Sequence, residues 1–360
     1  MKAVAGEARD GGEVGRRVPG RMGRVTMEDG ARPTLEAVAR RAGVSRGTVS
    51  RVVNDSPRVS DTARAAVTAA IEELGYVPNR AARMLVTRRT DTVALIVSEP
   101  QDRVFAEPFF PGIVRGITAA LADTDVQLLL AMAQHTGAGL QRYLSGQHVD
   151  GVMLLSLHAD DPLPDALDAA GVPFVSGGRP LSGRHPYVDA DNRDGARQAV
   201  AHLVATGRRR VATIAGPQDM AVGVDRLAGY RDGLARDGLP FDEALVTVAP
   251  DFSEEAGAAA MRELLTARPA PDAVFAASDP TALGALRYMK DHGTRVPDDV
   301  AVVGFDDAAT GRYTDPPLTT LHQPLGEMGG RMVRMLLARI AGESPPPEIV
   351  PTHLIVRASG

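Results

Sequence analysis

The sequence predicts an α/β protein: an N-terminal all-α head, followed by a two-lobed core that contains parallel sheets. Three observations indicate this organisation. Apolar residues in 34–86 follow only helical spacing. From residue 92 onward, short apolar runs alternate with helical patterns, as in parallel sheets that carry helices on both faces. Because a single sheet of all these strands would be large, two α/β lobes are expected.

Charge divides the chain at the same point. The 360 residues have a net charge of −5, but residues 1–90 carry +7 and residues 91–360 carry −12. A basic head on an acidic body suggests that the head binds a polyanion such as nucleic acid. The alternative is a chance excess of basic residues in a disordered leader.

Composition excludes several classes of protein. Hydrophobic residues make up 44% of the chain and charged residues 24%, which is typical of a folded soluble protein. The chain has no cysteine, which excludes disulfides, thiolate metal sites and cysteine nucleophiles. No apolar run approaches the ~20 residues of a membrane helix, and no apolar segment follows the basic N-terminus as in a signal peptide. We therefore expect a cytoplasmic, nucleoid-associated protein without a membrane partner.

Local signals delimit the segments of the head. Residues 1–32 are rich in Gly and Arg and lack apolar periodicity, which predicts a disordered extension. Met1, Met22 and Met27 all remain candidate start sites. A helical domain is expected over 33–78, followed by a short hinge helix and linker over 79–90.

Capping residues predict where the head helices begin and end. Thr34, Ser45 and Ser60 can cap helices over 35–42, 46–53 and 61–74, because a hydroxyl oxygen accepts from the free N–H groups of a first turn. Gly43 and Gly75 permit the left-handed backbone that ends a helix. Asn79 can cap a last helix over 80–86.

The first two helices have the tight spacing of a helix-turn-helix, whose second helix enters the major groove of DNA. Small Ala39 lets the helices approach, and Val44 and Val49 close a small core. The outer face of the second helix then carries Arg46, Gly47, Thr48, Ser50 and Arg51. Arginines suit guanine edges, and the hydroxyls of Ser45, Thr48 and Ser50 suit phosphates. The alternative for this face is an ordinary solvated helix surface.

In the core, apolar runs predict strands over 93–97, 126–130, 152–155, 173–175, 211–214, 273–276 and 300–303. Helical patterns separate them, among them 113–121, 196–204, 256–265 and 281–289. Residues 352–357 are also strand-like. Ligands of such folds bind at the carboxyl ends of the strands and, in two-lobed forms, in the cleft.

From Thr34 to the end, the sequence resembles the lactose-repressor/galactose-repressor (LacI/GalR) family of bacterial transcription regulators. Its most specific motifs lie in the head: Gly43-Val44-Ser45, Thr48-Val49-Ser50-Arg51-Val52-Val53-Asn54, Gly75-Tyr76-Val77-Pro78-Asn79 and Ala82-Arg83-Met84-Leu85. The core adds Asp191-Asn192-Arg193-Asp194-Gly195-Ala196, Arg226-Leu227-Ala228-Gly229-Tyr230, Ser278-Asp279-Pro280-Thr281-Ala282, Gly304-Phe305-Asp306-Asp307 and Pro317-Leu318-Thr319-Thr320-Leu321.

The resemblance implies a ligand-responsive regulator, most often a repressor, that binds a pseudo-palindromic double-stranded DNA operator as a homodimer. It implies that Arg51 reads a base and that the hinge helix inserts Leu85 into the minor groove, where an apolar wedge can bend DNA. The alternative role of Leu85 is packing between head and core. The positions expected at DNA are Thr34, Ser45, Arg46, Gly47, Thr48, Ser50, Arg51, Asn54, Tyr76, Asn79, Ala82 and Leu85.

The resemblance also implies a core like a periplasmic sugar-binding protein. Lobe one would cover about 91–190 and 322–349, and lobe two about 191–320 and 350–360. The residues expected to bind the effector are Phe109, Phe110, Asp191, Arg226, Phe252, Ser278 and Asp306. Aromatic rings, a carboxylate and a guanidinium fork suit a polyol, so a small sugar that releases DNA is expected. Ser278 departs from the asparagine of many relatives, so a purine or other metabolite, or a corepressor, stays an alternative.

Some of these residues also have a structural alternative. Phe110 and Phe252 could be core residues, and Arg226 could pair with an acidic surface residue. Asp306 could cap a helix, although Asp307 next to it is better placed for that.

The rival class is an α/β enzyme or a transport binding protein with a basic head. Residues 43–47 fit G-x-S-x-G, but that nucleophile motif needs a preceding strand, and a helix precedes it here. The sequence has no nucleotide-binding glycine loop and no zinc-protease motif, and its eight histidines lack ligand spacing. We therefore expect no enzyme activity, no cofactor and no metal.

Overall fold

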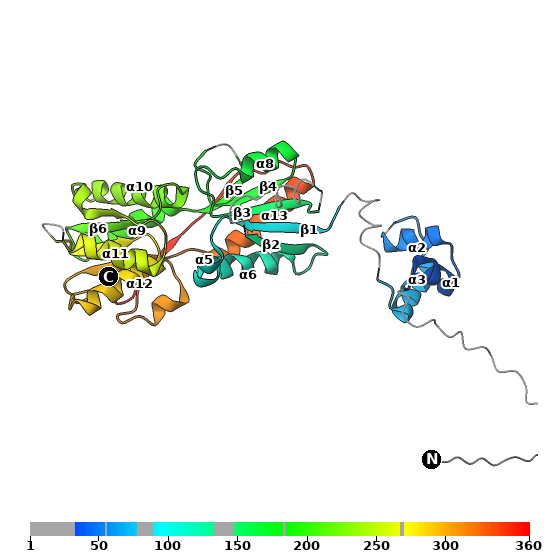
Figure 1. Ribbon diagram of the computed structural model, residues 1–360. Coiled ribbons are helices and arrows are strands. Elements are labelled where there is room, and N and C mark those ends of the chain that lie inside the picture. Colours follow the sequence, from blue (N-terminus) through cyan, green and yellow to red (C-terminus); the bar gives the residue numbers. More distant parts are fainter. Residues whose placement is uncertain are drawn as a thin grey trace, which may run out of the picture. The chain divides into compact units, whose positions relative to one another are not determined.

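The computed structural model describes residues 33–54, 56–77, 89–132, 146, 148–182, 185–266 and 270–360. The chain divides into two compact units, residues 1–83 and 84–360 (Figure 1). Among the described residues, no helix is both long enough and apolar enough to cross a lipid bilayer.

The described part of the head contains three helices, α1 (Leu35–Ala42), α2 (Arg46–Val53) and α3 (Asp61–Leu74). Their bounds confirm the prediction, and each begins at its predicted cap. Thr34 Oγ1 accepts from the N–H of Ala37 at 3.3 Å, Ser45 Oγ from that of Thr48 at 3.1 Å, and Ser60 Oγ from that of Ala63 at 3.4 Å. Gly43 and Gly75 end α1 and α3 with φ values of 68° and 60°. The predicted helix over 80–86 lies outside the described residues.

A small apolar core holds these helices together. Val38, Val49 and Val67 have no exposed surface, and Ala39, Ala70 and Tyr76 complete the cluster. Val44 packs partly against it, as predicted. Since α2 is anchored through Val49, its opposite face is open to solvent.

Lobe one of the core contains a parallel six-stranded sheet in the order β11-β5-β4-β3-β1-β2. Its strands are β1 (Thr92–Val97), β2 (Gln127–Met132), β3 (Gly151–Leu155), β4 (Phe174–Gly177), β5 (Tyr187–Ala190) and β11 (Glu348–Val350). Its helices are α5 (Gln101–Ala106), α6 (Phe109–Leu121), α8 (Leu163–Ala170) and α13 (Leu325–Ile340).

Lobe two contains a second six-stranded sheet in the order β12-β10-β9-β8-β6-β7. Its strands are β6 (Val211–Ala215), β7 (Val246–Val248), β8 (Ala273–Ala276), β9 (Ala301–Asp306), β10 (Thr319–His322) and β12 (His353–Ile355). Its helices are α9 (Asn192–Ala205), α10 (Ala221–Arg236), α11 (Glu254–Leu264) and α12 (Asp279–Asp291), with 3-10 turns at Glu243–Leu245 and Ala309–Arg312. This sheet is not fully parallel, because β12 runs antiparallel to β10.

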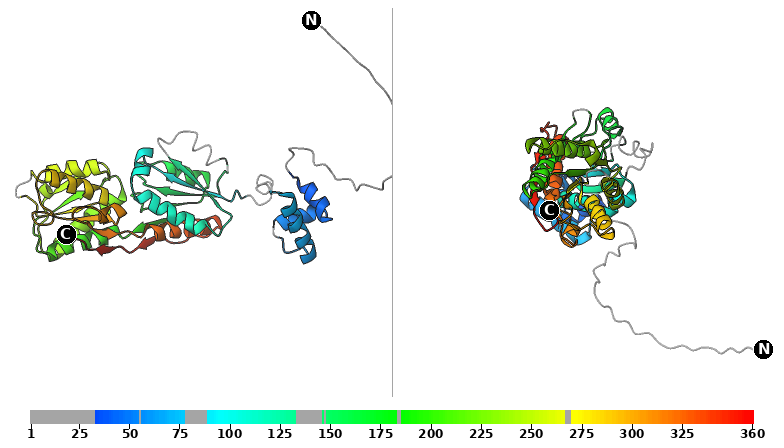
Figure 2. Two further views of the ribbon diagram at one scale, coloured as in Figure 1. Left: turned by 90° about the horizontal axis from the view of Figure 1, so that it is seen from below. Right: turned by 90° about the vertical axis from the view of Figure 1, so that its left-hand side faces the viewer.

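The two sheets form separate lobes, between which the chain crosses three times, after β5, β10 and β11 (Figures 1 and 2). At the last crossing only two residues separate β11, at the edge of one sheet, from β12, at the edge of the other. Short strands that include polar residues, such as Tyr187–Ala190 and Thr319–His322, were not predicted from apolar runs.

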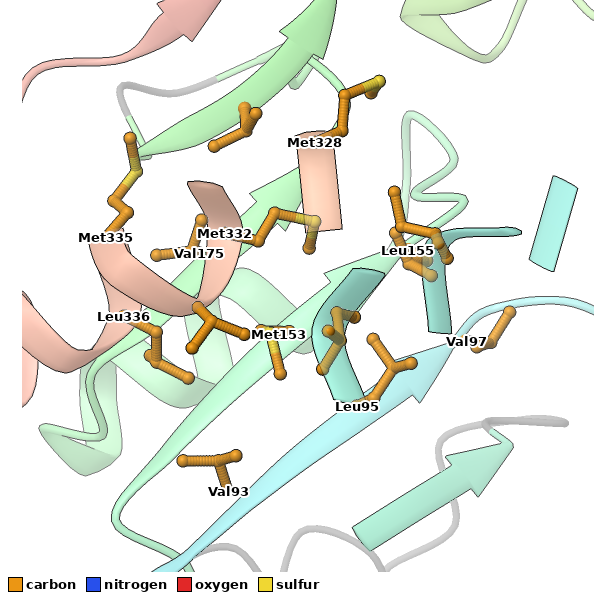
Figure 3. Packing of buried hydrophobic residues seen from close by; sticks show 14 of the residues in the cluster. Val93, Leu95, Val97, Met153, Leu155, Val175, Met328, Met332, Met335 and Leu336 are labelled. Carbon is orange, nitrogen blue, oxygen red and sulfur yellow. The ribbon is translucent and has the colours of Figure 1, made fainter. Parts of the chain in front are cut away.

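Buried side chains fill both faces of each sheet. In lobe one, Leu95, Met153 and Val175 from the strands pack against Met332 and Leu336 of α13 (Figure 3). Helices α6 and α13 approach closely because Gly116 has no side chain: a Cβ there would lie 2.3 Å from the carbonyl oxygen of Gly326. This packing holds α6, which begins at Phe109, against α13.

Candidate functional site

The exposed face of α2 is the candidate DNA interface of the head. Arg46, Gly47 and Arg51 are exposed, whereas Thr48 and Ser50 are half-buried. The hydroxyl oxygens of Ser45 and Thr48 lie 3.0 Å apart at the N-terminus of the helix. Two guanidinium groups and a hydroxylated helix N-terminus are groups that contact base edges and phosphates.

Other predicted DNA contacts already have roles within the head. Asn54 caps the C-terminus of α2, where its Nδ2 donates to the carbonyl oxygen of Ser50 at 2.9 Å. Arg46 pairs with Glu36 at 3.1 Å between two exposed side chains, a weak pair that DNA can displace. Tyr76 is only 8% exposed, and its burial favours a packing role. Asn79, Ala82 and Leu85 lie outside the described residues.

The candidate effector site is a cavity of about 560 Å³ between the two lobes. Six of the seven predicted effector residues line it: Phe109, Phe110, Arg226, Phe252, Ser278 and Asp306. The prediction for Asp191 needs correction, because its carboxylate caps α9 by accepting from the N–H of Asp194 at 3.0 Å. The next residue, Asn192, lines the cavity instead.

Arg226 is the polar centre of this cavity. It is 3% exposed, and its guanidinium lies 3.6 Å above the ring of Phe305. Its Nε donates to Asn192 Oδ1 at 2.9 Å and its Nη2 to Gln323 Oε1 at 3.1 Å. Its Nη1 donates to the carbonyl oxygen of Ala277. Protein groups therefore hold most of the donors that the sequence assigned to a sugar, so Arg226 also orders the walls of the cavity.

Asp306 faces Arg226 from the carboxyl end of β9. Arg226 Nη2 lies 3.5 Å from Asp306 Oδ1, and burial raises the pKa of Asp306 to about 6 against the attraction of Arg226. Asp306 has φ 117° and Asp307 has φ 55°, so two successive residues hold a strained backbone at the cleft. Such outliers persist where surrounding structure fixes them, as at binding sites.

Neither of these aspartates caps the following helical turn, contrary to the alternative drawn from the sequence. Ala308 occupies the N-cap position there without a side-chain hydrogen bond. Asp307 instead binds Arg357 and lies 3.1 Å from His322 Nδ1.

Aromatic residues and Ser278 complete the predicted part of the wall. Phe110 is 3% exposed within the core of lobe one and packs edge-on against Phe109, with ring centroids 5.2 Å apart. Ser278 caps α12, where its Oγ accepts from the N–H of Thr281 at 3.3 Å within a capping box. Phe110 and Ser278 therefore combine a place in the wall with a structural role.

The sequence analysis did not identify several polar residues of the cavity: Glu99, Glu107, Arg179, Asp189, Asn192 and Gln323. Burial raises the pKa of Asp189 to about 6, although its carboxylate accepts from the backbone N–H groups of Arg179 and Ala190 at 2.9 and 2.8 Å. Asp189 lies near the carboxyl end of β5, where ligands of such folds bind, but this strand was not predicted, so the rule could not be applied to the sequence.

Among the described residues of the core, three ion pairs join the lobes around this cavity, and we name them the interlobe pairs. Arg103 Nη2 lies 2.9 Å from Asp251 Oδ2, His158 Nδ1 lies 2.6 Å from Asp219 Oδ2, and Arg179 Nη2 lies 2.8 Å from Asp225 Oδ1. Although burial acts against it, the hydrogen bond to Asp219 raises the pKa of His158. Separation of the lobes would break all three pairs, so they favour the arrangement in which the lobes are held together.

Comparison with known proteins agrees with this architecture. The model of the family "Bacterial regulatory proteins, lacI family" matches residues 34–79, and that of the "Periplasmic binding protein-like domain" matches residues 200–360. The HTH-type transcriptional regulator CelR of Thermobifida fusca is 56% identical over 342 residues, which cover 93% of this chain and 100% of CelR. The HTH-type transcriptional regulator GalR of Salmonella typhimurium is 37% identical over 327 residues, covering 89% of this chain and 92% of GalR.

Solved structures give the same result. A complex of the transcriptional regulator CelR with cellobiose is 54% identical, covers 91% of this chain and 100% of its own, and superposes with a TM-score of 0.73. The lac repressor dimer bound to operator and the anti-inducer ONPF is 30% identical, covers 91% and 98%, and has a TM-score of 0.78. The chain therefore belongs to the LacI/GalR family of bacterial transcriptional regulators, which are DNA-binding proteins rather than enzymes.

Proposed function

We propose that this regulator is a repressor that binds a pseudo-palindromic operator as a homodimer and is released by cellobiose bound in the interlobe cavity. The observation that carries the proposal is the cavity itself, in which buried carboxyl groups and phenylalanine rings from both lobes face one space. The similarity of this chain to CelR, whose structure was solved in complex with cellobiose, indicates the class of sugar.

The dimensions and chemistry of the cavity support a disaccharide. Its volume of about 560 Å³ lies within the roughly 300–1,000 Å³ of small-molecule sites. Asp306 and Asp189 offer acceptors to hydroxyl groups, and Phe109 and Phe252 offer apolar surface to the faces of glucose rings.

The DNA-binding half of the proposal rests on α2 and on the segment that follows the head. Exposed Arg51 is in a position to read a base edge in the major groove, as in other helix-turn-helix proteins. Leu85 would act as a minor-groove wedge at the operator centre, where an easily unstacked pyrimidine–purine step is favoured. Two heads related by a two-fold axis require two inverted half-sites. Binding to chromosomal DNA implies a cytoplasmic location.

Closure of the lobes supplies a mechanism for release. Sugar between the lobes would favour the closed arrangement that the interlobe pairs stabilise. The closed form of the dimer would disfavour paired insertion of the two Leu85 side chains, so sugar and operator would weaken each other by the same factor, typically about 5–150-fold.

The test is operator binding with and without sugar. An operator is first selected from random duplexes, and its affinity is measured by fluorescence anisotropy alone and with cellobiose, glucose, galactose or a purine base. We expect cellobiose to weaken operator binding and light scattering to give a dimer. Release by a purine alone would overturn the sugar assignment, tighter binding with cellobiose would make it a corepressor, and a concentration-independent tetramer would overturn the dimer.

A further inference from the structure

Glu107 carries a largely buried carboxyl group, one oxygen of which is unsatisfied among the described residues. It lies between α5 and α6, lines the cavity, and has 14% of its side-chain surface exposed. Its Oε1 is fully buried and accepts no hydrogen bond from the described residues. Leaving a buried acceptor unsatisfied is unfavourable, and such groups in native proteins call for an explanation.

The nearby cation is already occupied by other carboxylates. Arg103 Nη1 binds Glu99 at 2.6 Å and its Nη2 binds Asp251 of lobe two at 2.9 Å. Its Nε lies 3.7 Å from Glu107 Oε1, beyond hydrogen-bond distance. Glu107 is therefore the carboxyl group that this cluster satisfies least.

The electrostatic surroundings agree with the geometry. Burial and the neighbouring carboxylate of Glu99 raise the pKa of Glu107 to about 7, against the attraction of Arg103. Asp306 and Asp251 of lobe two also face this group and raise its pKa further. Without a ligand, the fold therefore disfavours the charged form of Glu107 relative to its protonated form.

We propose that Glu107 is an effector-specificity residue, whose carboxylate accepts a hydrogen bond from one hydroxyl group of the bound sugar. This inference rests on the proposed function, because it requires a sugar in the cavity. A carboxylate is an acceptor with two equivalent oxygens, and its terminal torsion is broad and two-fold, so either oxygen can be turned toward the cavity. The adjacent Phe109 would contact the same sugar ring from the first turn of α6.

A site of this kind discriminates between sugars. An analogue without the matching hydroxyl leaves the buried carboxyl group unpaired, so it is rejected more strongly than its lost contact alone implies. Loss of one hydrogen bond to a charged group weakens ligand binding by about 10- to 100-fold.

The test combines one isosteric variant with a set of sugar analogues. Cellobiose binding to the full-length protein is measured by titration calorimetry for wild type, Glu107→Gln and a control, Glu343→Gln, which changes an exposed glutamate outside the cavity. We expect Glu107→Gln to bind cellobiose about 10- to 100-fold more weakly and the control to bind as wild type does. Among the monodeoxy cellobioses, one should bind wild type weakly but lose little further affinity in Glu107→Gln.

Thermal unfolding without sugar separates this role from a structural one. The proposal requires the midpoint of Glu107→Gln to equal or exceed that of wild type, because the substitution removes a buried charge whose Oε1 accepts no hydrogen bond from the described residues. A lower midpoint together with wild-type cellobiose affinity would make Glu107 structural and overturn the inference. Wild-type affinity in Glu107→Gln, when wild type binds cellobiose, would overturn this inference alone. Failure of wild type to bind any sugar would overturn both it and the proposed function.

Discussion

Substitution of Arg226 should separate the structural and ligand-binding roles of the cavity wall. Its guanidinium satisfies Asn192, Gln323 and the carbonyl oxygen of Ala277, and it neutralises Asp306 in a buried setting. Removing one partner of a buried ion pair typically costs about 3–5 kcal/mol. At roughly 2–4 °C per kcal/mol for a domain of this size, Arg226→Gln should lower the unfolding midpoint of the core by about 6–20 °C.

The matched variant is Asp306→Asn, which changes the other side of the same pair. Asparagine tolerates the positive φ of this position better than alanine does, and Arg226 keeps its three other acceptors. We expect a smaller loss of stability, operator affinity near that of wild type, and loss of the response to sugar.

Circular dichroism melts and operator anisotropy with cellobiose test both variants. The reasoning is refuted if Arg226→Gln melts within about 2 °C of wild type, or if Asp306→Asn is the less stable of the two. Release of DNA by Asp306→Asn at the wild-type sugar concentration would remove Asp306 from the effector site. Loss of operator binding without sugar would make it a structural residue.

Four further predictions concern the interlobe pairs, the titrating carboxyl groups and the DNA interface. Asp251→Asn breaks one partly exposed interlobe pair, so cellobiose affinity in calorimetry should fall about two- to fivefold, with operator affinity unchanged in the absence of sugar; tighter sugar binding would contradict this role. Burial raises the pKa of Glu107 to about 7 and that of Asp306 to about 6. The fold therefore favours the protonated form of both groups, and the stability that this gives is complete below the ordinary carboxyl pKa and is lost as pH rises toward 7. The melting point of sugar-free wild type should therefore fall over this range, and Glu107→Gln should fall less; parallel curves would argue against titration of Glu107. Arg51→Ala should relax base preference at one position per half-site by about 1–3 kcal/mol in a binding-site selection, and an unchanged preference would exclude it from base reading. Leu85→Ala should weaken operator binding while sparing random DNA, whereas equal losses on both would indicate a packing role.

Local sequence determined where the three described helices of the head begin and end. The bounds of α1, α2 and α3 follow from Thr34, Ser45 and Ser60 at the caps and from Gly43 and Gly75 at the turns. Capping and left-handed turns depend on residues within one helical turn, so they can be predicted without tertiary contacts. The family motifs also led to six of the seven predicted cleft residues, because a resemblance carries spatial information that a local pattern lacks.

Tertiary structure alone decided how those cleft residues are used. The partners of Arg226 lie 34, 51, 80 and 97 residues away in the sequence, so only the folded core reveals that its donors are largely taken. The one-residue difference between Asp191, a helix cap, and Asn192, a cavity residue, depends on where α9 begins against the sheet. The unsatisfied carboxyl group of Glu107 is likewise invisible in the sequence, because a missing hydrogen bond is a property of every group packed around it.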